Sequence, residues 1–137
     1  MRNRSIIIIS IFTLFLAVSC KKDDNGGGNT GPESPTDVTI DAPTPNAIIL
    51  NGTTLRIEGT AIDNNILTTV KVEIKNKTSG AVLFTNSVTT PNVTLYRFLW
   101  NWPVNGISSS FTATVKVTGR DIRGNEGFKE VDIKLEP

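Results

Sequence analysis

The sequence predicts an all-β fold, an antiparallel β-sandwich of about seven strands over residues 37–137. Two observations predict it. From Val38 onward, apolar side chains recur at every second position, which is the period of a strand with one buried face. Turn-forming clusters separate these segments, and no stretch shows the period and end caps of an amphipathic helix. Two such sheets would share one core, and an open barrel is the main alternative.

The strands follow one another between recognisable turns. Val70–Lys75 alternates most clearly, and Lys77–Gly80 is typical of a hairpin turn into the next strand. Asp121–Asn125 is the turn before the last strand. The expected strands are Val38–Ile40, Leu55–Ala61, Val70–Lys75, Ala81–Val88, Leu95–Trp102, Phe111–Val117 and Phe128–Leu135. The expected core comprises Ile40, Leu55, Ile57, Val70, Val72, Ile74, Phe84, Phe98, Phe111, Ala113, Val115, Val117, Val131 and Ile133.

Residues 1–19 have the three parts of a secretory signal peptide. Arg2 and Arg4 supply the positive start, the run from Ile6 to Val18 is mostly apolar, and Ser19 is a small residue suited to cleavage. The alternative is an uncleaved anchor helix, which needs about 20 apolar residues to cross a bilayer. Because this run is shorter, the sequence favours a cleaved export signal.

The export signal ends at the only cysteine of the chain, Cys20. The segment Ala17-Val18-Ser19-Cys20 resembles the lipobox of bacterial lipoproteins. The resemblance implies cleavage just before Cys20 and lipidation of its thiol, usually with acylation of the new amino group. Two or three acyl chains make a durable membrane anchor, whereas one chain binds only marginally. A free thiol or an intermolecular disulfide is the alternative role for a lone cysteine.

A short charged segment, Lys21-Lys22-Asp23-Asp24, follows the cysteine. It resembles the signal by which lipoproteins of Bacteroidetes reach the outer face of the outer membrane. The resemblance implies a cell-surface protein held by lipid on Cys20, with the periplasmic face of the outer membrane as the alternative. As an alternative of another kind, the four charges are only a solvated spacer beside the lipid.

Residues 20–36 connect this anchor to the domain. From Asn25 to Thr36 the chain has no large apolar residue and is rich in glycine and proline. Such a composition cannot bury enough surface to offset the entropy of ordering, so it predicts a disordered linker.

Composition excludes several classes of function. The chain has fourteen Lys and Arg against thirteen Asp and Glu, and removal of Arg2 and Arg4 leaves twelve basic residues, so the mature charge is near zero. This balance gives no electrostatic basis for binding nucleic acid. The chain has no histidine, the commonest general base and metal ligand. No nucleophile with a positioned base can be named, so the sequence predicts neither an enzyme nor a cofactor.

Two short motifs of the domain carry a resemblance to a known family. Gly59, Ala61 and Asp63 form a Gly-x-Ala-x-Asp segment, and Asp121, Gly124 and Asn125 form an Asp-x-x-Gly-Asn turn. With Pro43 to Asn51 and Val70 to Ile74, these segments resemble bacterial immunoglobulin-like domains. The resemblance covers nearly the whole mature domain and implies an immunoglobulin-like sandwich. It extends to small immunoglobulin-like lipoproteins of Bacteroidetes of unknown function. The histidine-rich segment that some of these carry is absent here, so no metal role follows from it.

Aromatic residues line one face of the expected strand Leu95–Trp102. Tyr96, Phe98, Trp100 and Trp102 occupy alternate positions and therefore project from the same side. In one interpretation Phe98 and Trp100 fill the core, and Tyr96 and Trp102 cover its ends. In the other, Tyr96, Trp100 and Trp102 form an exposed platform for sugar rings or for an apolar partner surface, with Leu95 and Leu99 facing the core.

Three oxygen-bearing side chains are candidates for a calcium site at one end of the sandwich. These are Asp63, Asp121 and Asn125, with Asp41 as a possible fourth. Calcium takes six to eight oxygen ligands, more than these residues supply. The alternative is that the side chains accept hydrogen bonds from backbone N–H groups of their own turns, and the sequence favours this alternative over a metal site.

The sequence therefore predicts a lipid-anchored, non-catalytic envelope protein whose immunoglobulin-like domain is a binding or spacer module. An exposed edge strand is the natural docking surface for another envelope protein. The alternative function is a carbohydrate-binding accessory of a surface glycan-uptake system, with the aromatic face as the binding site.

Overall fold

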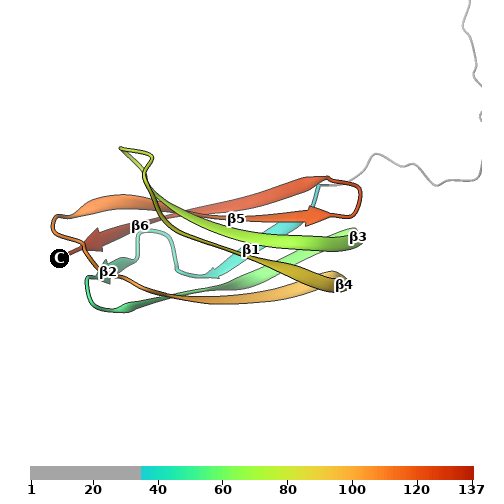
Figure 1. Cartoon of the computed structure of the whole chain (residues 1–137), viewed down its shortest axis with the longest axis horizontal. Helices are drawn as coiled ribbons and strands as arrows, with labels where there is room; N and C mark the ends of the chain where they lie inside the picture. Colours follow the sequence, from blue (N-terminus) through green and yellow to red (C-terminus); the bar gives the residue numbers. More distant parts are fainter. Residues whose placement is uncertain (1–34) are drawn as a thin grey trace, which may run out of the picture. The chain divides into compact units, whose positions relative to one another are not determined.

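A computed structural model describes residues 35–137, in which six β-strands occur (Figure 1). The predicted signal peptide, Cys20, the charged segment Lys21–Asp24 and nearly all of the linker lie outside the described residues. The strands are β1 (Asp37–Ala42), β2 (Ile48–Leu50), β3 (Thr54–Asn76), β4 (Val82–Pro103), β5 (Phe111–Asp121) and β6 (Glu126–Glu136). This part of the chain contains no helix that is long and apolar enough to cross a membrane.

The two longest strands, β3 and β4, each pass through both layers of a sandwich. Residues 54–62 of β3 pair with β1 on one side and with residues 95–103 of β4 on the other, and these segments form the first sheet. Residues 67–76 of β3 pair with residues 82–93 of β4 and with β5, which pairs with β6, and these form the second sheet. All these pairings are antiparallel, whereas the short β2 adds to β6 in parallel.

The structure confirms the all-β sandwich and contains all seven predicted strands. The difference is continuity: Leu55–Ala61 and Val70–Lys75 belong to one strand, β3, and the next two predicted strands belong to β4. The register shifts of β3 between its two halves allow this strand to turn from one sheet into the other without a loop. Strand β2 was not expected, because three consecutive apolar residues carry no alternation.

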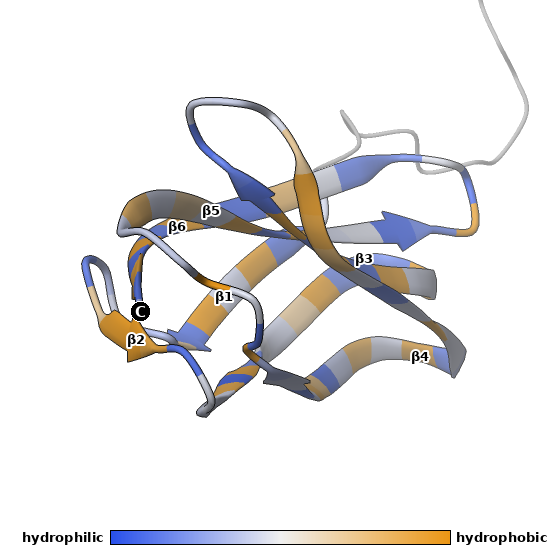
Figure 2. Ribbon diagram, turned by 60° about the vertical axis from the view of Figure 1, so that its left-hand side comes forward, coloured by the Kyte–Doolittle hydropathy of each residue, from blue (hydrophilic) through white to orange (hydrophobic). Residues whose placement is uncertain are grey.

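The core lies between the inward faces of the two sheets. Apolar and polar residues alternate along β3, β5 and β6 (Figure 2), and the inward positions of these strands are buried. Of the expected core, Ile40, Phe84 and Phe111 are only partly buried. Three further residues are buried although the alternation of the sequence did not predict them: Leu67, Val104 and Ile107. Leu67 lies at a register shift of β3, and the other two lie in the loop after β4.

Gly59 explains one part of the Gly-x-Ala-x-Asp segment. A Cβ atom at this position would lie 2.1 Å from the carbonyl oxygen of Thr39 and 2.7 Å from the ring of Phe98. Only glycine permits β1 and the Phe98 ring to approach β3 this closely. Ala61, two residues later on the same face, is fully buried. Small residues at these positions therefore hold the first sheet together.

Candidate functional site

The aromatic face of β4 points into the core. Trp100 and Trp102 are only 9% and 8% exposed, Phe98 is buried, and Tyr96 is partly buried. Phe98 and Trp100 stack with ring centroids 5.1 Å apart, and Trp102 stacks on Phe84 from the other half of the same strand at 5.8 Å. The latter pair joins the two sheets along the β4 side of the sandwich.

The expectation of an exposed aromatic platform at Tyr96, Trp100 and Trp102 is therefore wrong. Both faces of this segment are apolar, and the larger rings occupy the core because they remove more surface from water than leucine does. Leu95 and Leu99, expected inside under the platform interpretation, are 47% and 53% exposed. The alternative interpretation, with Phe98 and Trp100 in the core, is confirmed.

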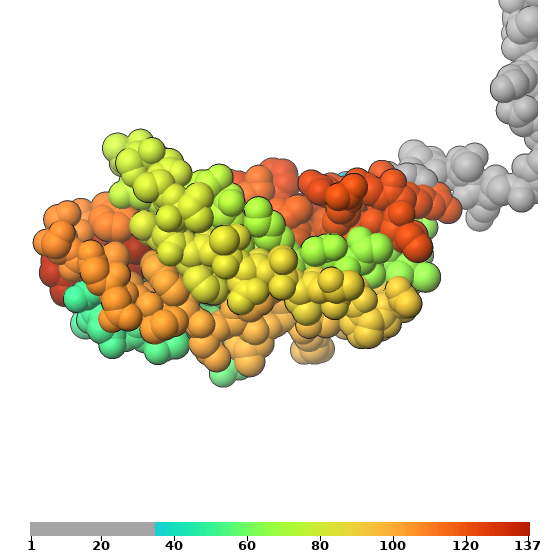
Figure 3. Space-filling view, in the orientation of Figure 1, coloured from blue at the N-terminus to red at the C-terminus, as the bar shows by residue number. Residues whose placement is uncertain are grey.

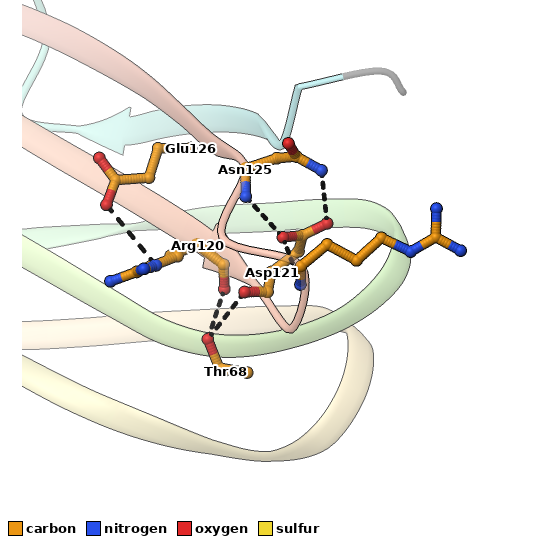
Figure 4. A network of polar contacts seen from close by, with 6 residues as sticks. Thr68, Arg120, Asp121, Asn125 and Glu126 are labelled. Atoms are coloured by element: carbon orange, nitrogen blue, oxygen red, sulfur yellow. Dashed lines mark hydrogen bonds and ion pairs between the residues drawn. The ribbon is translucent and has the colours of Figure 1, made fainter. Parts of the chain in front are cut away.

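Asp121 organises the turn between β5 and β6 (Figure 4). Its Oδ1 accepts hydrogen bonds from the backbone N–H groups of Arg123 (2.9 Å) and Asn125 (2.7 Å). Its Oδ2 accepts from the side-chain amides of Asn125 (3.0 Å) and Asn65 (3.1 Å). Burial by itself would raise the pKa of the Asp121 carboxyl, but these hydrogen bonds outweigh burial and hold the pKa below its usual value.

The same end of the domain contains Asp63 in an analogous role. Asp63 is buried and accepts hydrogen bonds from the Thr36 hydroxyl (2.7 Å) and from the backbone N–H of Asn65 (2.7 Å). Asn65 thus connects Asp63 with Asp121. Thr68 also joins β3 to the end of β5, because its hydroxyl donates to the carbonyl oxygens of Arg120 and Asp121 (Figure 4).

This arrangement favours turn capping over calcium binding at Asp63, Asp121 and Asn125. Both carboxylates accept hydrogen bonds from N–H and O–H groups at each of their oxygens. Asp41 is exposed near the opposite end of β1 and does not join them. Within residues 35–137 no three His, Cys, Asp or Glu side chains lie close enough together to hold a metal ion.

The outer face of the second sheet is covered by ion pairs. Glu73 lies 3.5 Å from Lys71 and 2.6 Å from Lys75, and Lys116 lies 3.4 Å from Glu130. The ammonium of Lys116 also lies 3.8 Å from the centroid of the Phe128 ring. An open groove of about 370 Å³ runs over this face, and its charged lining residues are largely these paired side chains. We call this surface the charged face.

The β4 side of the molecule is different. Between Thr78 and Val115 the only charged residue is Arg97. Among the described strands, β4 pairs with β3 alone, so its other edge is free along its whole length. Figure 3 shows the yellow segment that contains the first half of β4 lying open on the surface.

Free edges of the other strands are protected. β1 is short, carries Asp37 and Asp41, and shifts register after Ile40, while β6 is partly covered by β2. Charges, short length and irregular register are the usual defences of an edge against pairing with another chain. The segment 95–103 carries a single charge, Arg97, and its nine pairs with β3 run without a shift.

We define the β4 surface as the free edge of residues 95–103 together with the exposed side chains of Ile62, Leu95 and Leu99. Ile62 lies directly opposite Leu95 on the outer face of the first sheet. An exposed edge strand was predicted, but not which one. The uncharged run from Thr78 to Val115 is the signal in the sequence that would have identified it.

No protein-family model and no characterised protein matches the chain in sequence. Solved structures match its fold. The fibronectin(III)-like modules of Clostridium thermocellum CbhA are 16% identical over 73% of this chain and 96% of theirs, with a TM-score of 0.50. A Niemann-Pick type C2 protein from the Japanese carpenter ant is 8% identical over 76% of this chain and 95% of its own, also with a TM-score of 0.50.

The fold is an immunoglobulin-like antiparallel β-sandwich. At these identities the likeness concerns the fold alone.

Proposed function

We propose that this protein is a lipid-anchored, non-catalytic binding module of the bacterial outer membrane, and that it docks a protein strand on its β4 surface. One observation carries the binding role: a regular nine-residue edge with no acidic residue and one basic residue, Arg97, flanked by exposed leucines. An incoming strand would satisfy the unpaired backbone groups of this edge and cover Leu95 and Leu99.

The apolar side chains strengthen the proposal because they have no role in the core. Exposed backbone alone is satisfied by water, so edge pairing gains little without apolar burial. Ile62 and Leu95 lie opposite each other, and Leu99 lies on the same outer face four residues further along β4. Burying each of these side chains contributes roughly 1–2 kcal/mol. A strand docked on the edge would cover both positions.

The anchor is part of the same proposal. Lipid on Cys20 would hold the protein in the membrane, and Lys21-Lys22-Asp23-Asp24 would direct it to the cell surface. Residues 20–36 would then give the domain reach. A catalytic role has no support: the chain has no histidine, and the carboxylates of Glu73 and Glu130 are engaged in ion pairs.

Photo-crosslinking in intact cells tests the binding role. The full-length chain carries a photoreactive amino acid in place of Leu99, or in place of Phe128 as the control, since both side chains are exposed and apolar. We expect a protein adduct from position 99 and none from position 128. Equal adducts at both positions, or none at position 99, would contradict the proposal.

Metabolic labelling with an alkynyl fatty acid tests the anchor. The wild-type chain should take up the label, and Cys20→Ala should not. Protease added to intact cells should remove the domain of the wild type but spare a variant in which Lys21, Lys22, Asp23 and Asp24 are alanine. Wild-type protein that is cut only after lysis would place the domain inside the envelope.

A further inference from the structure

We infer that the strand docked on the β4 surface is the same segment, residues 95–103, of a second copy of this chain. The inference rests on the proposed binding role and names its partner. The two copies would be related by a two-fold axis, and their first sheets would join into one antiparallel sheet.

The geometry selects one register. The regular segment begins at Leu95, opposite Ile62, and ends at Pro103, opposite Thr54. Before it, β4 is irregular: Asn92 has a positive φ of 54°, and the ladder with β3 shifts register on the preceding residues. Antiparallel pairing of the whole regular segment with itself places its midpoint, Leu99, on the two-fold axis.

The side chains match in this register. Leu99 lies opposite Leu99 of the second copy, and Arg97 lies opposite its Asn101, an acceptor for the guanidinium. On the inner side, Phe98 lies opposite Trp100 of the second copy, but both rings are already buried in their own core, so the new side-chain contacts come from the outer face. A register shifted by two residues toward the N-terminus would instead set Arg97 against Arg97, which opposes like charges.

Charge favours a second copy over an unrelated partner. A foreign strand is usually selected by complementary charges, and this edge offers only Arg97. This edge is, in contrast, compatible with itself, because in the Leu99 register its single charge, Arg97, lies opposite Asn101 of the second copy and not opposite a second Arg97. On the outer face, Leu99 of one copy would contact Leu99 of the other at the two-fold axis.

Disulfide trapping tests both the partner and the register in the full-length chain. Paired strand residues have Cα atoms about 4.5–5.5 Å apart, which suits a disulfide. Leu99→Cys should therefore form a covalent dimer on mild oxidation. Arg97→Cys and Asn101→Cys should each stay at the wild-type level, because each cysteine lies four residues out of register, roughly 13 Å along the strand. Mixing these two variants should produce the crosslink that neither forms alone.

Sedimentation of the purified full-length chain in density-matched detergent provides a second test. The wild type should have the mass of a dimer. Leu99→Glu should have the mass of a monomer, since the substitution sets two carboxylates opposite each other. Phe128→Glu, the same change at an exposed apolar residue of the charged face, should remain a dimer.

Three results would overturn the inference: a monomeric wild type, equal trapping at positions 97, 99 and 101, or a Leu99→Cys adduct with the mass of a different protein. The wild type, which retains Cys20, reports any crosslinking through that thiol. A photoadduct between position 99 and a different protein would support the binding role but contradict the inference that the partner is a second copy of this chain. Fatty-acid labelling tests the anchor independently of all these outcomes.

Discussion

The charged face and the β4 side of the sandwich expose different kinds of side chain to solvent. On the charged face, lysines and glutamates pair along β3, as in Lys71–Glu73–Lys75, and between β5 and β6, as in Lys116–Glu130. On the β4 side, the chain from Thr78 to Val115 exposes threonine, serine, asparagine and leucine, with Arg97 as the only charge.

This difference separates stability from specificity. Exposed ion pairs contribute about 0–1 kcal/mol each, so the charged face adds little to folding. Charges on strands disfavour pairing with other chains, and the β4 side carries only one, Arg97. Stability should therefore depend on the inner faces of both sheets, and association on the β4 surface.

The largest effect is expected within β4 itself. Trp102→Ala removes a buried ring that stacks on Phe84 and should lower the free energy of unfolding by about 3–5 kcal/mol. Leu99→Ala, on the opposite face of the same strand, should change it by less than about 0.5 kcal/mol in the monomer. Urea unfolding followed by circular dichroism measures both. Comparable losses would mean that the two faces of β4 are not energetically distinct.

Gly59→Ala should have the next largest effect, about 1–3 kcal/mol, because its Cβ would overlap the Thr39 carbonyl and the Phe98 ring. Thr60→Ala, a neighbouring position on the outer face, is the matched control and should be nearly neutral. Thermal unfolding compares them. If Gly59→Ala is as stable as wild type, β1 does not lie against β3 as closely as described.

A buried carboxylate should matter more than any on the charged face. Asp121→Asn places an amide donor against the amides of Asn65 and Asn125 and should cost about 1–3 kcal/mol. Asp41→Asn, at an exposed position, should cost less than about 0.5 kcal/mol. Urea titrations at neutral pH measure these differences.

The pH dependence of Asp121 has a definite sign. Hydrogen bonding holds the pKa of the folded carboxyl below the ordinary aspartate value of about 3.9. Its stabilising contribution is complete above that value and is lost as pH falls through the folded pKa. The difference in unfolding free energy between wild type and Asp121→Asn should therefore stay constant from pH 7 to about 5 and shrink at lower pH. A difference that grows in acid would contradict this assignment.

The smallest effect is expected on the charged face. The Lys75 ammonium, with Lys71 nearby, holds the pKa of Glu73 below its usual value. Glu73→Gln should nevertheless cost at most about 1 kcal/mol, and about 1 M salt should remove most of that loss. Unfolding at low and high ionic strength measures it. A loss above that of Asp121→Asn would break the contrast between the two sides.

Much of the fold could be predicted from the period of two. That pattern located all seven strands and the inward residues of β3, β5 and β6, because each of these has one apolar face. It did not show that β3 and β4 continue from one sheet into the other, since irregular residues between two strands look like a loop. Asp121 and Asp63 were identified with their turn-capping role, but Asn65, which connects them, carries no signal of its own.

By itself, the sequence determined the class of fold, the strand positions and the absence of a histidine-based active site, because alternation and composition are local properties of the chain. The tertiary structure decided which face of residues 95–103 is buried. That choice is not local: both faces are apolar, and only the space opposite Phe84 and beside Gly59 determines that the rings lie inside and the leucines outside. The free edge of β4 is likewise decided by strand order, which no single segment encodes.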